Sequence, residues 1–108
     1  MSAPARAAID AAMSEKDFQR QVLDLAKAEG WIVYHTNDSR RSHPGFPDLV
    51  LLRGPQLLFL ELKTERGKAT PAQVSWINRL DAAKRVEAAV ARPSNWPDIE
   101  RALTSRAR

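Results

Sequence analysis

Two short segments rich in leucine, residues 48–52 and 57–63, most constrain what this chain can fold into. Gly54-Pro55 lies between them and predicts a tight turn, so the two segments are expected to pair as an antiparallel hairpin. In the second segment, apolar residues fall on both alternating faces of a strand. That pattern is typical of a central strand, and it requires other elements to pack on each face of the sheet.

The sequence on either side of the hairpin predicts the covering elements. Ser14 is a suitable N-cap for a first helix that ends near Gly30. Thr70 and Gln73 have the spacing of a capping box at the start of a second helix. Two more strands and a third helix are expected at 31–35, at 86–91 and after a break at 93–97. The resulting order, α-β-β-β-α-β-α, predicts an α/β sandwich.

The length and composition are those of a single domain. The 108 residues carry a formal net charge of +4, and a chain of this size can bury a core without disulfides. We expect one domain over 14–104. Residues 1–13 are rich in alanine but interrupted by proline and charged residues, so a disordered tail is expected there, and 105–108 are expected to fray.

The absence of cysteine narrows the chemistry. It excludes a disulfide scaffold, a zinc ribbon and thiol catalysis, and it fits the reducing cytoplasm of a bacterium or a phage-infected cell. No apolar stretch approaches the ~20 residues that span a bilayer, so no membrane partner is expected. The basic charge favours a polyanionic partner.

Three charged residues, Asp48, Glu61 and Lys63, lie at the ends of the predicted hairpin strands. Asp48 begins one strand and Glu61 ends the other, so their side chains are expected to lie opposite each other. Glu61 and Lys63 share one strand face, about 7 Å apart. Two adjacent carboxylates can bind a hard divalent cation, and a lysine beside them can orient a water or offset charge on a phosphate. The layout favours metal-assisted phosphodiester hydrolysis over a turn aspartate and a simple Glu61–Lys63 ion pair.

Two further residues are candidates for the same site. Glu15 lies on the same helical face as Phe18 and Val22, which directs it toward the sheet edge. The alternative for Glu15 is stabilisation of the helix N-terminus. Gln73 is either a site residue or only a capping residue. No pair of histidines has the spacing of zinc ligands, so zinc is not expected.

Several basic residues are candidates for phosphate contacts. Arg40 and Arg41 lie in the polar, turn-rich segment before the first hairpin strand, and we expect them to bind DNA. Arg53, Arg66 and Lys68 are further candidates for this role. The alternative is a basic surface that contacts only solvent.

Four sequence motifs together resemble the VRR-NUC (virus-type replication-repair nuclease) domain of the PD-(D/E)xK nuclease superfamily, in its small stand-alone, phage-like form. They are the segment from Ser14-Glu15 to Gly30-Trp31, Gly45-Phe46-Pro47-Asp48-Leu49-Val50, Glu61-Leu62-Lys63-Thr64, and Gly67-Lys68-Ala69-Thr70-Pro71-Ala72-Gln73. The resemblance covers residues 14–103. It departs near the C-terminus, where no aromatic residue precedes Arg92-Pro93.

The resemblance implies a restriction-endonuclease-like fold, with helices flanking a mixed central sheet, and a divalent-metal nuclease activity. Asp48 and Glu61 match the metal-binding acids of the family, and Lys63 matches its catalytic lysine. Glu15 matches its acidic residue on the first helix, and Gln73 matches its glutamine at the start of the helix after the motif.

The expected activity is endonucleolytic cleavage of DNA, with selectivity for branched substrates such as four-way junctions. Mg²⁺ or Mn²⁺ is the expected cofactor, bound by Asp48, Glu61 and the backbone carbonyl of Leu62, with Glu15 acting through water; no organic cofactor is expected. Because one small domain offers one site, cutting two strands favours a homodimer. Three alternatives stay open: a non-catalytic nucleic-acid-binding domain of the same fold, an accessory subunit whose acids hold a structural cation, and an RNA substrate.

Overall fold

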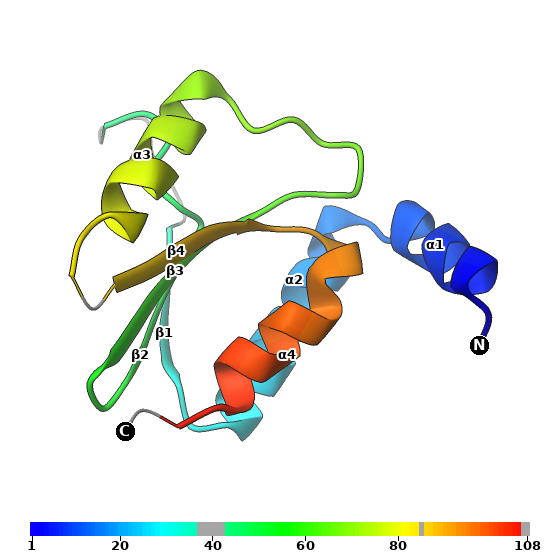
Figure 1. The fold of residues 1–108 in the computed structure, drawn as a ribbon, viewed down its shortest axis with the longest axis horizontal. Coiled ribbons are helices and arrows are strands. Elements are labelled where there is room, and N and C mark those ends of the chain that lie inside the picture. The colour runs from blue at the N-terminus through cyan, green and yellow to red at the C-terminus, as the bar shows by residue number, and fades with distance from the viewer. Residues whose placement is uncertain (37–42, 85, 107–108) are drawn as a thin grey trace.

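A computed structural model describes residues 1–36, 43–84 and 86–106, which form one four-stranded sheet flanked by helices (Figure 1). The strands are β1 (Ile32–His35), β2 (Leu49–Arg53), β3 (Gln56–Leu62) and β4 (Val86–Ala91), in that order across the sheet. β2 pairs antiparallel with β1 and β3, whereas β4 pairs parallel to β3. The predicted α/β fold, the hairpin and the central position of its second strand are therefore confirmed.

The helices cover the two faces of the sheet unequally (Figure 1). They are α1 (Ala3–Ala12), α2 (Glu15–Ala28), α3 (Pro71–Asp81) and α4 (Trp96–Thr104), with a short 3₁₀ turn, η1 (Pro93–Asn95), before α4. α2 and α4 pack on one face, and α3 packs on the other face over β3 and β4. None of the helices within 1–36, 43–84 and 86–106 has the length and apolar character needed to cross a membrane.

The core lies between the sheet and the α2–α4 pair. Phe18 and Val22 of α2, together with Leu103 of α4, are fully buried against it. They meet the inward face of β2 and β3, where Leu49 and Leu60 are buried. Burial of side chains of this size contributes about 1.5–3 kcal/mol each, so this layer fixes the sheet on which the charged residues are mounted.

The predicted helix starts are present with their hydrogen bonds. The Ser14 hydroxyl accepts from the backbone N–H of Asp17 at 3.1 Å, which caps α2. The Thr70 hydroxyl accepts from the backbone N–H of Gln73 at 3.2 Å, and the Gln73 side chain accepts in return from the Thr70 N–H, which completes the capping box of α3. Gly30 follows α2 with a positive φ of 82°, as a helix-ending glycine requires.

The expectation of a disordered N-terminal tail is wrong, because residues 3–12 form α1. Alanine has the highest helix propensity, and Pro4 lies in the first turn, where a missing N–H costs nothing. The Ser2 hydroxyl caps the helix by accepting from the Ala5 N–H at 3.2 Å. Asp10 of α1 is buried, and α1 contacts η1. Pro4 therefore marks a helix start rather than an interruption.

The C-terminal end is also more ordered than expected. α4 begins at Trp96, inside the predicted break, and Pro97 lies in its first turn. The backbone carbonyl of Ser105 accepts hydrogen bonds from the Arg53 and Gln56 side chains. Arg106 lies 3.7 Å from the Glu29 carboxylate. Ser105 is thus held to the β2–β3 hairpin and Arg106 lies beside the end of α2, while 107–108 fall outside the described residues.

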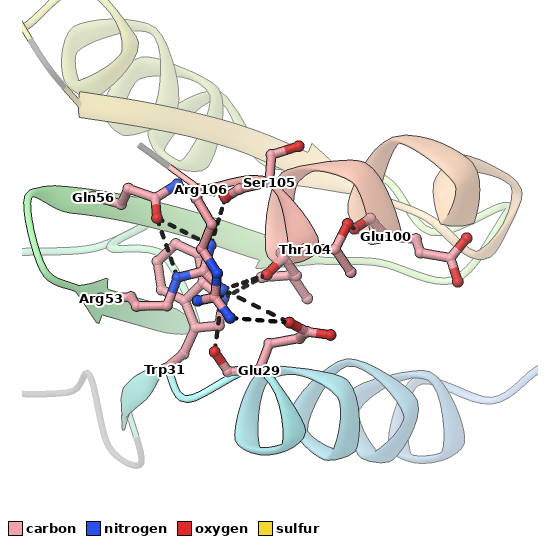
Figure 2. A network of polar contacts seen from close by, with 9 residues as sticks. Glu29, Trp31, Arg53, Gln56, Glu100, Thr104, Ser105 and Arg106 are labelled. Atoms are coloured by element: carbon pink, nitrogen blue, oxygen red, sulfur yellow. Dashed lines mark hydrogen bonds and ion pairs between the residues drawn. The ribbon is translucent and has the colours of Figure 1, made fainter. Parts of the chain in front are cut away.

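Arg53 is the centre of this C-terminal network (Figure 2). Its guanidinium donates to the backbone carbonyls of Glu29 at 3.1 Å and Leu103 at 2.8 Å, and it stacks on the Trp31 ring at 4.5 Å. The Trp31 indole N–H donates to the same Leu103 carbonyl at 3.0 Å. Because these contacts direct its guanidinium into the protein, the suggestion that Arg53 binds a phosphate is wrong.

Candidate active site

The hairpin register places Asp48 and Glu61 at the same edge of the sheet. Leu49 pairs with Leu60, so Asp48, just before β2, lies across from Glu61, the residue after Leu60. The Asp48 carboxylate accepts from the backbone N–H of Leu62 at 3.0 Å, which fixes its position beside β3. The expectation that the two acids face each other is therefore confirmed.

Glu61 is an unusual residue for the interior of a sheet. It is only 2% exposed, and its Oε1 atom is buried with no hydrogen-bond partner among the described residues. The pKa of Glu61 is raised to about 7, chiefly by burial and then by the Asp48 charge, with Lys63 partly opposing both effects. A buried carboxylate with one idle oxygen costs free energy unless a ligand is bound there, so the site is suited to accept a cation.

Lys63 lies on the same face as Glu61, as the alternation of the strand predicts. Its Nζ is 3.3 Å from Oε2 of Glu61, and its side chain is 16% exposed. The Lys63 backbone N–H donates to the Ala91 carbonyl at 3.0 Å, which continues the parallel ladder between β3 and β4. The simple ion pair considered from the sequence thus exists, and the Lys63 side chain remains partly exposed to solvent.

Gln73 combines the two roles that the sequence presented as alternatives. Its side-chain carbonyl accepts from the Thr70 N–H at 2.8 Å and completes the capping box. Its side-chain amide donates to Oε2 of Glu61 at 3.1 Å. The first turn of α3 is therefore attached to Glu61, so capping does not account for all the contacts of Gln73.

The segment before Asp48 is held against α3 by close packing. Gly45 has a positive φ of 89°, and a Cβ on it would lie 2.5 Å from the backbone carbonyl carbon of Ala72. The Trp76 indole N–H donates to the Pro44 carbonyl at 3.1 Å, and the Phe46 ring meets the Trp76 ring at a centroid distance of 5.1 Å. This role of Trp76 is not predicted by the sequence, although Gly45, two residues before Pro47-Asp48, is a signal for a close backbone approach.

The remaining candidates are not brought to the acidic pair in the same way. Glu15 is exposed in the first turn of α2. No group of three or more His, Cys, Asp or Glu side chains placed to hold a metal occurs in 1–36, 43–84 and 86–106, so Glu15 does not join Asp48 and Glu61 in such a cluster. Arg66 and Lys68 are exposed in the loop between β3 and α3. Arg40 and Arg41 lie outside the described residues.

The oxygen donors at this site fit a hard divalent cation that takes only a few of its ligands from the protein. Asp48 and Glu61 supply carboxylate oxygens, one of which is idle, and Mg²⁺ is commonly bound by one or two carboxylates with water and substrate oxygens completing its shell. The absence of cysteine from the chain, and of a third acidic ligand from the described part, argues against a closed structural zinc site.

The sequence model of the VRR-NUC domain matches residues 7–95. The chain belongs to the VRR-NUC family. This match spans the acidic pair, the lysine, the capping glutamine and part of α1, so the family domain extends beyond the segment on which the resemblance was first based. No curated protein matches the chain.

Solved structures of VRR-NUC proteins share the fold. One, named "VRR_NUC domain", is similar with a TM-score of 0.65 and 24% sequence identity over 82% of this chain and 95% of that chain. Another, named "VRR_NUC domain protein", has a TM-score of 0.63 and 25% identity over 82% of this chain and 85% of that chain. The flanked four-stranded sheet is therefore the fold of a nuclease family.

Proposed function

We propose that this protein is a DNA endonuclease that uses Mg²⁺ or Mn²⁺ to hydrolyse phosphodiester bonds. The observation that carries the proposal is the environment of Glu61. Its carboxylate is buried beside Asp48, is bonded to Lys63 and Gln73, and keeps one oxygen without a partner among the described residues. A structural ion pair would not require a second acid and an idle oxygen at the same place.

Each residue of the site has a distinct role in this proposal. Asp48 and Glu61 hold the cation together with the backbone carbonyl of Leu62, and Glu15 contributes through water. The bound cation supplies charge stabilisation at the phosphate and a more acidic water. Lys63 orients the attacking water and offsets the charge that develops on the phosphoryl oxygens. Gln73 holds Glu61 in place through its 3.1 Å hydrogen bond.

The basic surface next to the site supports a nucleic-acid substrate. Arg66 and Lys68 are exposed in the loop that begins directly after Lys63, and a strand whose phosphate lies at Lys63 is proposed to contact these two cations as well. Contacts of this kind bind the backbone without reading sequence, which suits an enzyme selective for DNA shape such as a four-way junction. Arg40 and Arg41 are proposed to add contacts to the same strand.

A homodimer is proposed to supply the second site that cutting two strands requires. Ile32, Tyr34 and Leu52 are 71%, 65% and 43% exposed, and the register of β1 and β2 places them on one face of the sheet. α3 covers that face over β3 and β4. Side chains of this size leave a few hundred Å² of apolar surface, a large part of the ~800 Å² per partner in a standard interface.

The dimer is tested by light scattering of the purified protein and of an Ile32→Lys/Tyr34→Lys double variant. Charges at both positions should shift the mass from two chains to one, because like charges would face each other across a two-fold axis. A wild-type protein that is monomeric at working concentration contradicts this part of the proposal and leaves the nuclease assignment intact.

The nuclease activity is tested with labelled duplex, flap, four-way junction, single-stranded DNA and RNA in Mg²⁺, Mn²⁺ or EDTA. Asp48→Ala and Lys63→Ala should each abolish cleavage while far-ultraviolet circular dichroism stays unchanged. Asp98→Ala and Lys84→Ala are matched controls at exposed positions and should cleave as the wild type does. Undiminished cleavage by Asp48→Ala or Lys63→Ala would overturn the assignment, and cleavage of RNA alone would overturn the choice of DNA.

A further inference from the structure

Arg92 makes an unusual set of contacts just after the end of β4. One nitrogen of its guanidinium, Nη1, donates to the backbone carbonyls of Thr64 at 2.8 Å, Gly67 at 2.7 Å and Glu65 at 3.4 Å. These carbonyls belong to the turn that follows Lys63. Because a turn exposes carbonyls that its own N–H groups cannot all satisfy, a single cation that donates to three of them fixes its shape.

Neighbouring residues hold the same turn from the same side. The backbone N–H of Ser94 donates to the Glu65 carboxylate at 2.6 Å. The Arg92 backbone N–H donates to the Asn95 side chain at 2.9 Å, which anchors the arginine itself. Together with the bond from the Lys63 N–H to the Ala91 carbonyl, these contacts attach the start of the β3–α3 loop to the β4–η1 junction.

We propose that Arg92 is a positioning residue for substrate binding. It fixes the loop of residues 64–68 so that Arg66 and Lys68 meet phosphates of the DNA strand that lies at Lys63. This inference rests on the proposed nuclease function and deepens it. Arg66 and Lys68 are themselves exposed, so in a free loop each would have to be ordered when DNA binds. A loop that is already fixed avoids that entropic cost, which is the physical meaning of preorganisation.

The contacts also indicate which kinetic constant depends on Arg92. Among the hydrogen bonds of the described residues, those of the Arg92 side chain end on loop carbonyls and none reaches the carboxylates of Asp48 or Glu61. Lys63 keeps its own ladder bond and its ion pair with Glu61. Loss of the Arg92 side chain should therefore weaken DNA binding and raise KM, with a much smaller effect on kcat.

The test is a double-mutant cycle between Arg92→Ala and the Arg66→Ala/Lys68→Ala pair. In the otherwise wild-type chain, Arg92→Ala should raise KM, and the dissociation constant for labelled DNA in EDTA by fluorescence anisotropy, by about tenfold, as expected for coupled residues. In the chain that already lacks Arg66 and Lys68, the same substitution should change either constant less than about twofold. Temperatures are set so that every variant stays folded by circular dichroism.

Two further variants separate positioning from general stability. Arg92→Lys should recover most of the affinity, because an ammonium also offers several N–H donors from one nitrogen. Arg101→Ala removes an exposed arginine of α4, whose partner is Asp98 at 2.9 Å, and should leave KM unchanged. Hydrogen exchange of the Gly67 amide, which donates to the Thr64 carbonyl, should accelerate in Arg92→Ala and recover in Arg92→Lys.

The possible outcomes distinguish this inference from the function on which it rests. An Arg92→Ala effect that is equal in both backgrounds, or that falls on kcat rather than KM, overturns the positioning role even if the wild type cleaves DNA. A wild type that binds DNA without metal-dependent cleavage overturns the nuclease proposal, and the anisotropy cycle still decides the role of Arg92. A wild type that neither binds nor cleaves overturns both.

Discussion

The substitution Glu61→Gln tests the central electrostatic property of the site, which is that the Glu61 carboxylate is costly to ionise in the folded chain. Burial and, after it, the Asp48 charge raise its pKa from an ordinary value of 4.5 to about 7, although Lys63 partly opposes them. Between these pH values the unfolded chain releases the proton and the folded chain keeps it. The free energy of unfolding of the metal-free wild type should therefore fall as pH rises from about 4.5 to 7, and it should change no further through this group above pH 7.

The size of the effect follows from the two pKa values. Each tenfold difference in proton affinity corresponds to about 1.4 kcal/mol, so ionising Glu61 in the folded chain costs roughly 3 kcal/mol. Glutamine has nearly the same shape and can still accept from Gln73, but it gives up the ion pair with Lys63. We therefore expect Glu61→Gln to be about as stable as the wild type at pH 4.5 and about 1–3 kcal/mol more stable at pH 8.

The assay is urea unfolding in EDTA at several pH values between 4.5 and 8.5, followed by tryptophan fluorescence. Glu100→Gln, at an exposed position of α4, is the matched control and should follow the wild type at every pH. Added Mg²⁺ should stabilise the wild type and not Glu61→Gln, because a ligand stabilises only the state that binds it. A Glu61→Gln protein that is less stable than the wild type at pH 8, or that differs from it equally at all pH values, would refute the reasoning.

Three other predictions concern the supports of the site and its metal. Gly45→Ala should lower the free energy of unfolding by about 1–3 kcal/mol and reduce cleavage, since a Cβ at a φ of 89° meets the backbone of α3; urea titration and initial rates measure both effects. Arg53→Ala should cost about 2–4 kcal/mol by removing the donor to the Glu29 carbonyl and the bonds that tie the Leu103 and Ser105 carbonyls to the sheet, with kcat preserved at temperatures where the variant is folded. The affinity for Mg²⁺ should fall up to about tenfold for each pH unit below 7, because the cation must displace a proton from Glu61. Isothermal titration at pH 6 and pH 8 measures this change in affinity. Repeating the titration in two buffers measures the proton release.

The parts of the structure that could be predicted from sequence are those set by local patterns. Alternating apolar residues fixed the faces of β3, and capping residues fixed the starts of α2 and α3. The hairpin then determined that Asp48 and Glu61 face each other, because a short turn leaves only one register that keeps Leu49 and Leu60 buried. That register alone was enough to predict a pair of carboxylates at one edge of the sheet.

Other features depend on contacts between residues distant in sequence, and no local pattern contains them. Arg53 and Arg66 each precede a glycine in a turn, so their local sequences are alike. Arg53 is nevertheless directed into the C-terminal network, whereas Arg66 is exposed. The bonds from Arg92 to the turn after Lys63 span 25 to 28 positions of the chain. The error at α1 has another cause, since Pro4 was judged as a helix breaker without regard to its position in the first turn.

The residues of the site also have structural roles, which explains why the sequence allowed both a structural and a functional interpretation of each one. Asp48 closes the hairpin by accepting from Leu62, and Gln73 caps α3 while it donates to Glu61. Such bonds hold the side chains in place without any ligand, which is what a preorganised site requires. The exception is Oε1 of Glu61, which is buried and accepts no hydrogen bond from the described residues. A buried carboxylate oxygen that accepts no hydrogen bond from the described residues is best explained by a ligand from outside, and the neighbouring Asp48 carboxylate makes that ligand a cation.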